Sequence, residues 1–79
     1  MTGSPNFIAA VDRNAYEEYR LYVTEHEGLD VFRIEHWRKR GGDFAYASTA
    51  LQIRAAKLRG FENAVIKATE TARAKGLCK

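Results

Sequence analysis

Residues 32–48 read FRIEHWRKRGGDFAYAS and decide the fold that we predict for this chain. Residues 31–37 alternate between apolar and polar side chains, which is typical of a half-buried strand. A run of cations then leads to Gly41 and Gly42, and glycine readily takes the positive φ values of tight turns. Residues 44–47 can return as a second strand. The stretch therefore predicts a β-hairpin with a cationic tip.

The chain before this hairpin predicts one strand and one helix. Residues 7–11 form a short continuous apolar run between turn signals, which is typical of a buried strand. Asn14, with Glu17 three residues later, fits a capping box, and Gly28 is a typical residue after a helix end. We therefore predict a helix over residues 15–27. A strand stays open as the alternative, because the same residues also alternate between β-forming and polar side chains.

Two interpretations stay open for the chain after the hairpin. In the first, a helix begins at Ser48 or Thr49 and ends at Gly60, residues 61–67 form a strand, and a last helix covers residues 70–75. In the second, one long helix runs from Ala50 to Lys75, with Gly60 inside it at a cost of about 1 kcal/mol.

Both interpretations give one small domain over residues 1–79 with an α/β or α+β fold. The expected element order is β-α-β-β-α-(β)-α, a sandwich in which a sheet of three or four strands packs with two or three helices. A chain of this length buries only about 60% of its unfolded surface, so the core is thin. Residues 1–5 are polar, and we expect them to be disordered.

Cysteine content and hydropathy indicate the cellular environment of the protein. The only cysteine, Cys78, cannot form an internal disulfide, which fits a reducing, cytoplasmic environment. No run of about 18 apolar residues is present, so we expect no contact with a membrane.

Charge is distributed unevenly along the chain. The net charge is +3, yet residues 1–30 carry two basic against six acidic side chains, and residues 31–79 carry eleven basic against four acidic ones. The two halves therefore have net charges of −4 and +7. Such an asymmetry suggests an oriented contact with a partner, although the two halves can also attract each other within the fold.

The strongest candidate for a binding site is basic. Three consecutive cations at the hairpin tip, and a second cluster at helical spacing, are suited to neutralising phosphates. Aromatic neighbours, including Phe44 and Tyr46, offer rings for stacking on bases. A solvated turn that discourages edge pairing is the competing interpretation of the same cations. The candidate residues are Trp37, Arg38, Lys39, Arg40, Arg54, Lys57 and Arg59.

The predicted helix over residues 15–27 supplies a second candidate surface. Glu17, Glu18 and Tyr22 would form an acidic, aromatic face on it, and tyrosine is enriched at protein interfaces. Packing of the tyrosines against the sheet is the alternative.

Residue types that carry catalysis or bind metal are sparse. The two histidines, His26 and His36, lack the spacing and the cysteine partners of a zinc site. Cys78 has no base near it in the sequence, and no glycine-rich phosphate loop or nucleophile motif occurs. We therefore expect no catalytic residue, no metal, no cofactor and no enzymatic activity.

Two functions of different classes follow. The first is a non-enzymatic module that engages nucleic acid or a nucleoprotein complex through the basic residues above. The second is a small inhibitor or adaptor that occupies a partner protein's surface, in the manner of regulatory effectors encoded by phages. A thin core and an exposed edge strand also suggest a homodimer.

Overall fold

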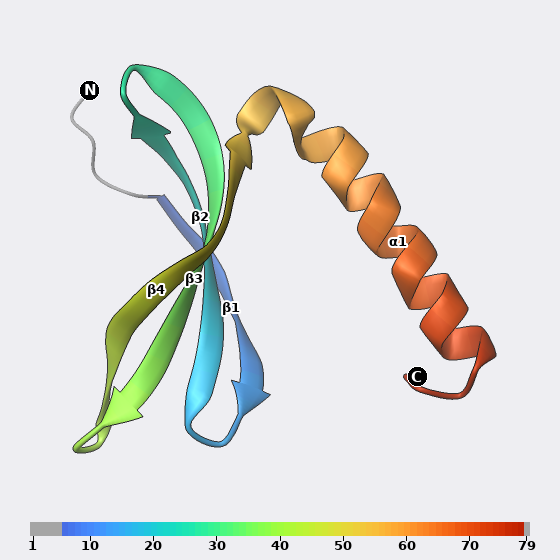
Figure 1. Ribbon diagram of the computed structural model, residues 1–79, viewed down its shortest axis with the longest axis horizontal. Coiled ribbons are helices and arrows are strands. Elements are labelled where there is room, and N and C mark those ends of the chain that lie inside the picture. The colour runs from blue at the N-terminus through green and yellow to red at the C-terminus, as the bar shows by residue number, and fades with distance from the viewer. Residues whose placement is uncertain (1–5, 79) are drawn as a thin grey trace.

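The computed structural model describes residues 6–78 and shows an α+β fold, in which a four-stranded antiparallel sheet precedes one helical segment (Figure 1). The strands lie in the order in which they occur along the chain, so the sheet is a meander. Residues 1–5, where we expected disorder, lie outside the described part. The elements are β1 (Asn6–Asn14), β2 (Glu17–His26), β3 (Leu29–Arg40), β4 (Asp43–Arg54), the 3₁₀ turn η1 (Ala55–Lys57) and α1 (Leu58–Ala74).

The predicted hairpin is confirmed and is longer than expected. β3 and β4 pair from Arg40 and Asp43 at the turn to Val31 and Arg54 at the far end. Gly41 and Gly42 form the turn between them, both with positive φ (59° and 98°). Positive φ at both central residues gives a turn whose twist matches that of the flanking strands, which is why two glycines favour a tight hairpin here.

The predicted helix over residues 15–27 is wrong, because this segment is β2. The two signals that suggested helix ends instead build hairpin turns. The Asn14 side chain donates a hydrogen bond to Glu17 (2.8 Å) and accepts one from the backbone N–H of Tyr16 (2.8 Å). These contacts close the turn from β1 to β2 in the manner of an Asx turn. Gly28, with φ of 81°, belongs to the turn between β2 and β3.

The element order predicted after the hairpin is also wrong. Residues 49–54 belong to β4, because Leu51 and Ile53 pair with Ile34 and Phe32 of β3. No helix therefore begins at Ser48 or Thr49. Residues 61–67, predicted as a strand in the first interpretation, lie within α1. The second interpretation, one long helix, is right for residues 58–74 and places Gly60 inside α1, but it begins the helix too early.

The sheet has two faces of different chemistry, because directly opposed residues on antiparallel strands share a face. We call one the apolar face; it carries Val11, Tyr19, Leu21, Val23, Phe32, Ile34, Leu51 and Ile53. We call the other the outer face; it carries Glu18, Arg20, Tyr22, Arg33, Glu35, Trp37, Lys39, Phe44, Tyr46, Thr49, Gln52 and Arg54.

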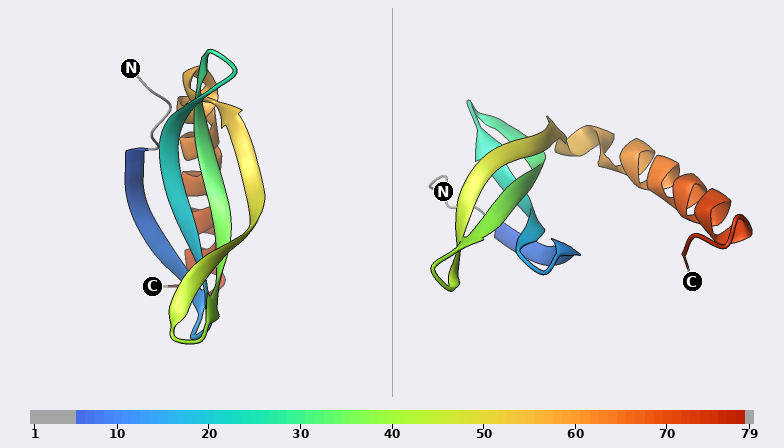
Figure 2. Two further views of the ribbon diagram at one scale, coloured as in Figure 1. Left: turned by 90° about the vertical axis from the view of Figure 1, so that its left-hand side faces the viewer. Right: turned by 60° about the horizontal axis from the view of Figure 1, so that its bottom comes forward.

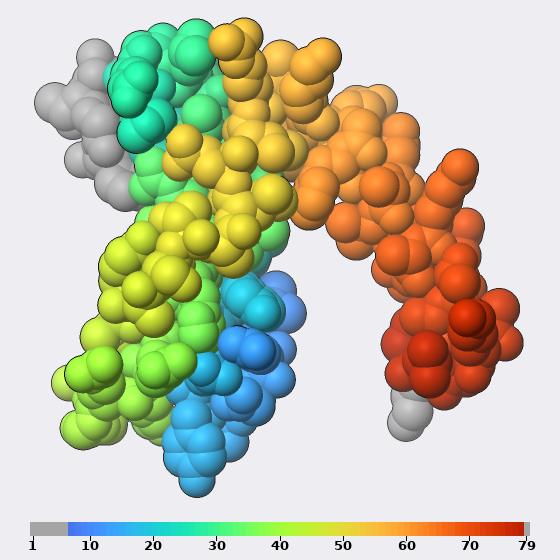
Figure 3. Space-filling model, viewed as in Figure 1, coloured from blue at the N-terminus to red at the C-terminus, as the bar shows by residue number. Residues whose placement is uncertain are grey.

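The helix α1 contacts the sheet near its own first turns and then runs away from it (Figures 1 and 2). The Phe61 ring lies 5.8 Å from the Phe32 ring, centre to centre. In the space-filling view, the C-terminal half of α1 stands clear of the strands (Figure 3). Among residues 7–78, only Tyr22, Val31 and Phe32 are buried hydrophobic residues. The core is therefore even thinner than the chain length suggests.

No helix in residues 6–78 is long and apolar enough to cross a membrane.

Candidate nucleic-acid interface

The outer face is organised around an arginine that crosses from β2 to β3. The guanidinium carbon of Arg20 lies 4.0 Å from the centre of the Trp37 ring and 5.8 Å from that of Phe44. Arg20 also forms an ion pair with the buried Glu18 on the same strand. The hydrogen bond to this carboxylate is the main cause that raises the pKa of Arg20, so the guanidinium stays charged beside the ring.

Trp37 is held in a fixed orientation. Its indole N–H donates a hydrogen bond to Glu35 (2.9 Å), and Tyr46 meets it edge-on, with ring centres 6.2 Å apart and planes at 80°. The Tyr46 hydroxyl lies 2.8 Å from the hydroxyl of Thr49. Tyr46 is 53% exposed. Because Arg20 covers one side of Trp37, Tyr46 is the aromatic side chain of this group that offers more free surface to a ligand.

A second arginine continues the row of cations along the outer face. Arg33 lies on β3 and donates a hydrogen bond to Gln52 of β4 (2.9 Å). It also pairs with Glu35 at 3.4 Å. The acidic side chains on this part of the sheet are thus each matched by an arginine, and they set the direction in which the arginines point.

The hairpin tip carries the three consecutive cations predicted from the sequence. Arg38 lies 3.4 Å from Glu17, and the Lys39 ammonium lies 5.9 Å from the centre of the Phe44 ring. Within the described part of the chain, Lys39 and Arg40 form no ion pair. These two cations are therefore available to an anionic partner.

The second predicted cluster does not lie beside the tip. Arg54 is the last residue of β4, Lys57 ends η1, and Arg59 lies in the first turn of α1, 3.8 Å from Glu62. A strand rises about 3.3 Å per residue, so β4 separates the two clusters by roughly 35 Å. Between the two clusters, the cations Arg20 and Arg33 lie on the outer face.

The predicted acidic face of Glu17, Glu18 and Tyr22 does not form, because these residues lie on a strand. Glu17 points to one side of the sheet and Glu18 and Tyr22 to the other. Glu18 and Tyr22 are each only 9% exposed. Tyr22 packs edge-on against Phe7 of β1, with ring centres 5.6 Å apart.

Glu17 instead anchors a polar cluster at the tip end of the sheet. Its carboxylate accepts hydrogen bonds from Asn14 (2.8 Å) and Arg38 (3.4 Å), and lies 3.0 Å from His36 Nε2 and 3.6 Å from Arg13. The bond from Asn14, followed by the charge of Arg13 and by His36, lowers the pKa of Glu17 against a smaller opposing effect of desolvation. This cluster ties the β1–β2 turn to β3.

Two residues of the outer face were missed by the sequence prediction. Arg20 falls within the helix expected over residues 15–27, and Arg33 falls within the strand expected over residues 31–37, and neither is among the candidate residues. The alternation of residues 19–24 was the available signal. As a strand, residues 19–24 place Arg20 on the same face as Tyr22, and the pairing with β3 places it directly across from Glu35 on that face.

In the part of the chain that the structure describes, no group of three or more histidine, cysteine or acidic side chains is placed to hold a metal ion. Cys78 is exposed, with its thiol 3.7 Å from the carbonyl oxygen of Thr69.

Comparison of the chain with protein families, with curated proteins and with solved structures gives no match.

Proposed function

We propose that this protein binds single-stranded nucleic acid across the outer face of its sheet and the adjoining hairpin tip. One observation supports this most: the register of the strands gathers cations and aromatic rings on a single face. Arg20 lies against Trp37 and Phe44, and Tyr46 meets Trp37 edge-on. Arg33 lies on the same face, farther along β3. This combination is what single strands require, because their phosphates need cations and their unstacked bases need rings.

The two parts of the surface have different tasks in this proposal. Lys39 and Arg40 at the tip, and Arg54 at the other end of β4, are exposed and neutralise phosphates. Tyr46 stacks on a base, supported from behind by Trp37. A base inside a duplex is already stacked on its neighbours and does not reach such a ring, so the geometry favours a single strand over a duplex.

The sequence dependence of binding is expected to be weak. Stacking accepts every base, because every base has an aromatic face. Arg20 and Arg33 are already paired with Glu18 and Glu35, which leaves their guanidinium groups oriented but partly engaged. The binding free energy is therefore expected to come mainly from phosphate contacts and stacking, and to depend strongly on salt.

The test is a salt series with a labelled single-stranded oligonucleotide, read by fluorescence anisotropy. Replacing Arg38, Lys39 and Arg40 together by Ala removes three tip cations. Lys39 and Arg40 are the two of these that form no ion pair, so we expect the slope of log K against log salt to fall by about 1.4, at about 0.7 per phosphate contact.

The matched control replaces three cations of α1 and its C-cap by Ala, so that both triple variants have the same net charge; these cations are Lys67, Arg73 and Lys75. Its slope should stay close to that of the wild type. Absence of binding at about 50 mM salt, or equal effects of the two triple variants, would contradict the proposed surface and favour a protein partner.

A further inference from the structure

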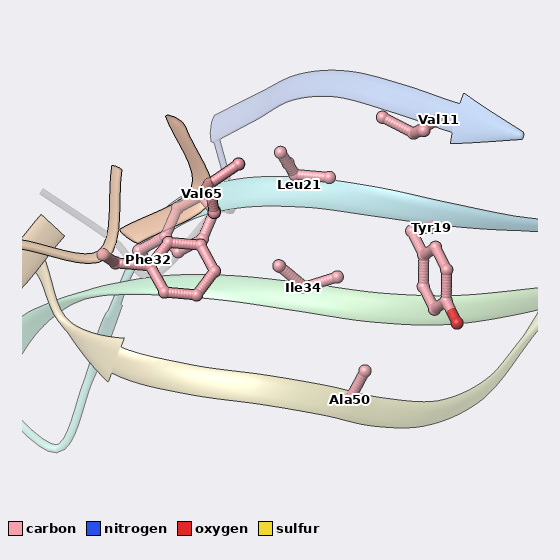
Figure 4. A pocket seen from close by; sticks show the side chains of 8 residues that line it. Val11, Tyr19, Leu21, Phe32, Ile34, Ala50 and Val65 are labelled. Atoms are coloured by element: carbon pink, nitrogen blue, oxygen red, sulfur yellow. The ribbon is translucent and has the colours of Figure 1, made fainter. Parts of the chain in front are cut away.

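The apolar face of the sheet is largely uncovered. Val11 is 53% exposed and Val65 of α1 is 46% exposed, while Leu21 and Ile34 between them are only half-buried. These side chains line an open groove of about 400 Å³ between the sheet and α1, in which Tyr19 is the lining residue with a polar side-chain atom (Figure 4). A chain of soluble composition rarely leaves such a surface in water unless another surface covers it.

The helix α1 carries a matching apolar stripe. Its apolar residues recur in alternating steps of three and four, at Leu58, Phe61, Val65, Ala68 and Ala72. This spacing is the seam by which helices pack against one another, and it needs a second helix or an apolar sheet as its partner. The first turns of α1 pack against Phe32 of the chain's own sheet, through Phe61. The rest of the seam has no partner among the described residues.

Two global measures show how much surface is left over. A folded monomer of 9.0 kDa is expected to expose about 4,900 Å², whereas this chain exposes 6086 Å². Its radius of gyration is 14.5 Å, against about 12 Å expected for 79 residues. The excess surface is on the order of 1,000 Å². This is as much as each partner buries in a stable protein–protein interface, about 800 Å² or more.

We propose that the occupant of this groove is a second copy of the same chain. Each copy supplies both an apolar groove and an apolar helical seam, so a twofold arrangement buries both surfaces at once and closes after two copies. The contact between Phe61 and Phe32 fixes where α1 leaves the sheet, which keeps its later turns away from the groove of its own chain. The outer face points away from this interface, so the inference does not depend on the proposed binding of nucleic acid.

The test measures the molar mass of the full chain by light scattering after size-exclusion chromatography. The wild type is expected at twice 9.0 kDa. Val65→Asp places a charge in the seam and should weaken dimerisation at least tenfold. The matched control, Asn63→Asp, adds the same charge two residues away, on the opposite side of α1, and should leave the dimer intact.

A second pair of variants separates loss of the interface from loss of folding. Val11→Asp lies on the apolar face and should also give the monomer, whereas Ala10→Asp lies on the opposite face of the same strand and should not. Circular dichroism checks that each variant keeps its strands. The melting temperature of the wild type should rise with protein concentration, because dissociation accompanies unfolding.

Two results would overturn the proposal. One is a measured molar mass of 9.0 kDa for the wild type at about 100 μM, together with a melting temperature that does not depend on protein concentration. This result would mean that α1 closes on its own sheet. The other is a dimer that neither Val65→Asp nor Val11→Asp weakens, which would place the interface on another surface.

Discussion

The guanidinium carbon of Arg20 lies 4.0 Å from the centre of the Trp37 ring, across the pairing of β2 with β3. The same arginine forms an ion pair with Glu18. A cation, an aromatic ring and a buried carboxylate thus form one unit in the middle of the outer face. This unit ties the stability of the sheet to the surface that we propose for binding.

Arg20→Ala is expected to lower the free energy of unfolding by about 1–3 kcal/mol, because it leaves the Glu18 carboxylate buried without its partner. Chemical denaturation measures this change. The double variant Glu18→Gln with Arg20→Ala should recover part of the loss, since no charge is then left unpaired. Equal stability of the single and double variants would show that the unpaired carboxylate is not the cause of the loss.

Tyr46→Ala is expected to weaken binding of a single-stranded oligonucleotide by about tenfold, since stacking on an aromatic side chain is worth about 1–3 kcal/mol per base. The free energy of unfolding should change little, because the ring is more than half exposed. Ile66→Ala is the control, since Ile66 is a 47% exposed side chain of α1, away from the outer face and the hairpin tip. Fluorescence anisotropy at one fixed salt concentration measures both affinities. Equal losses from both variants would argue against a specific stacking site.

The stability of the sheet should depend on pH through Glu17. Its pKa in the folded protein is lowered from the ordinary value of 4.5, so its contribution is present above about that pH and is lost as pH falls through the folded pKa. Glu17→Gln cannot titrate and should show a flatter loss of stability in this acid range. Denaturation curves between about pH 3 and 6 measure the difference. Parallel curves for the two proteins would contradict the role of this carboxylate.

Phe61→Ala should detach α1 from the sheet, because the contact with the Phe32 ring is the aromatic contact that joins them. We expect the free energy of unfolding to fall by about 2 kcal/mol, less than for a fully buried phenylalanine. Ile66→Ala is the control, since this side chain is exposed. Denaturation followed by circular dichroism compares the two variants, and an equal effect of both would contradict the anchoring role of Phe61.

The strands β1 and β3 and the glycine turn were predictable from the apolar run, the alternation and the paired glycines. The burial expected for residues 7–11 is wrong, because β1 is an edge strand on which Phe7, Ile8 and Val11 are each more than half exposed. The turns at the two ends of β2 could not be predicted. Asn14 with Glu17 serves equally as a helix cap or as an Asx turn, and Gly28 serves equally as the residue after a helix or as part of a hairpin turn. Only the pairing with β1 and β3 decides between them, and pairing is a property of the whole sheet.

The candidate site was predictable at its tip and not at its centre. The run from Arg38 to Arg40 is contiguous in sequence and needs no fold to bring it together. Arg20, Trp37 and Tyr46 at the centre of the site come from three strands, and they meet only in the register that the structure shows. The error over β2 therefore removed Arg20 from the predicted site.

The most direct measurement is NMR chemical-shift mapping of the labelled protein titrated with a short single-stranded oligonucleotide. We predict the largest shifts at the indole N–H of Trp37 and at the backbone amides of Arg20, Arg33 and Tyr46, with small shifts along α1. An absence of shifts, or shifts confined to α1 and the apolar face, would contradict binding on the outer face.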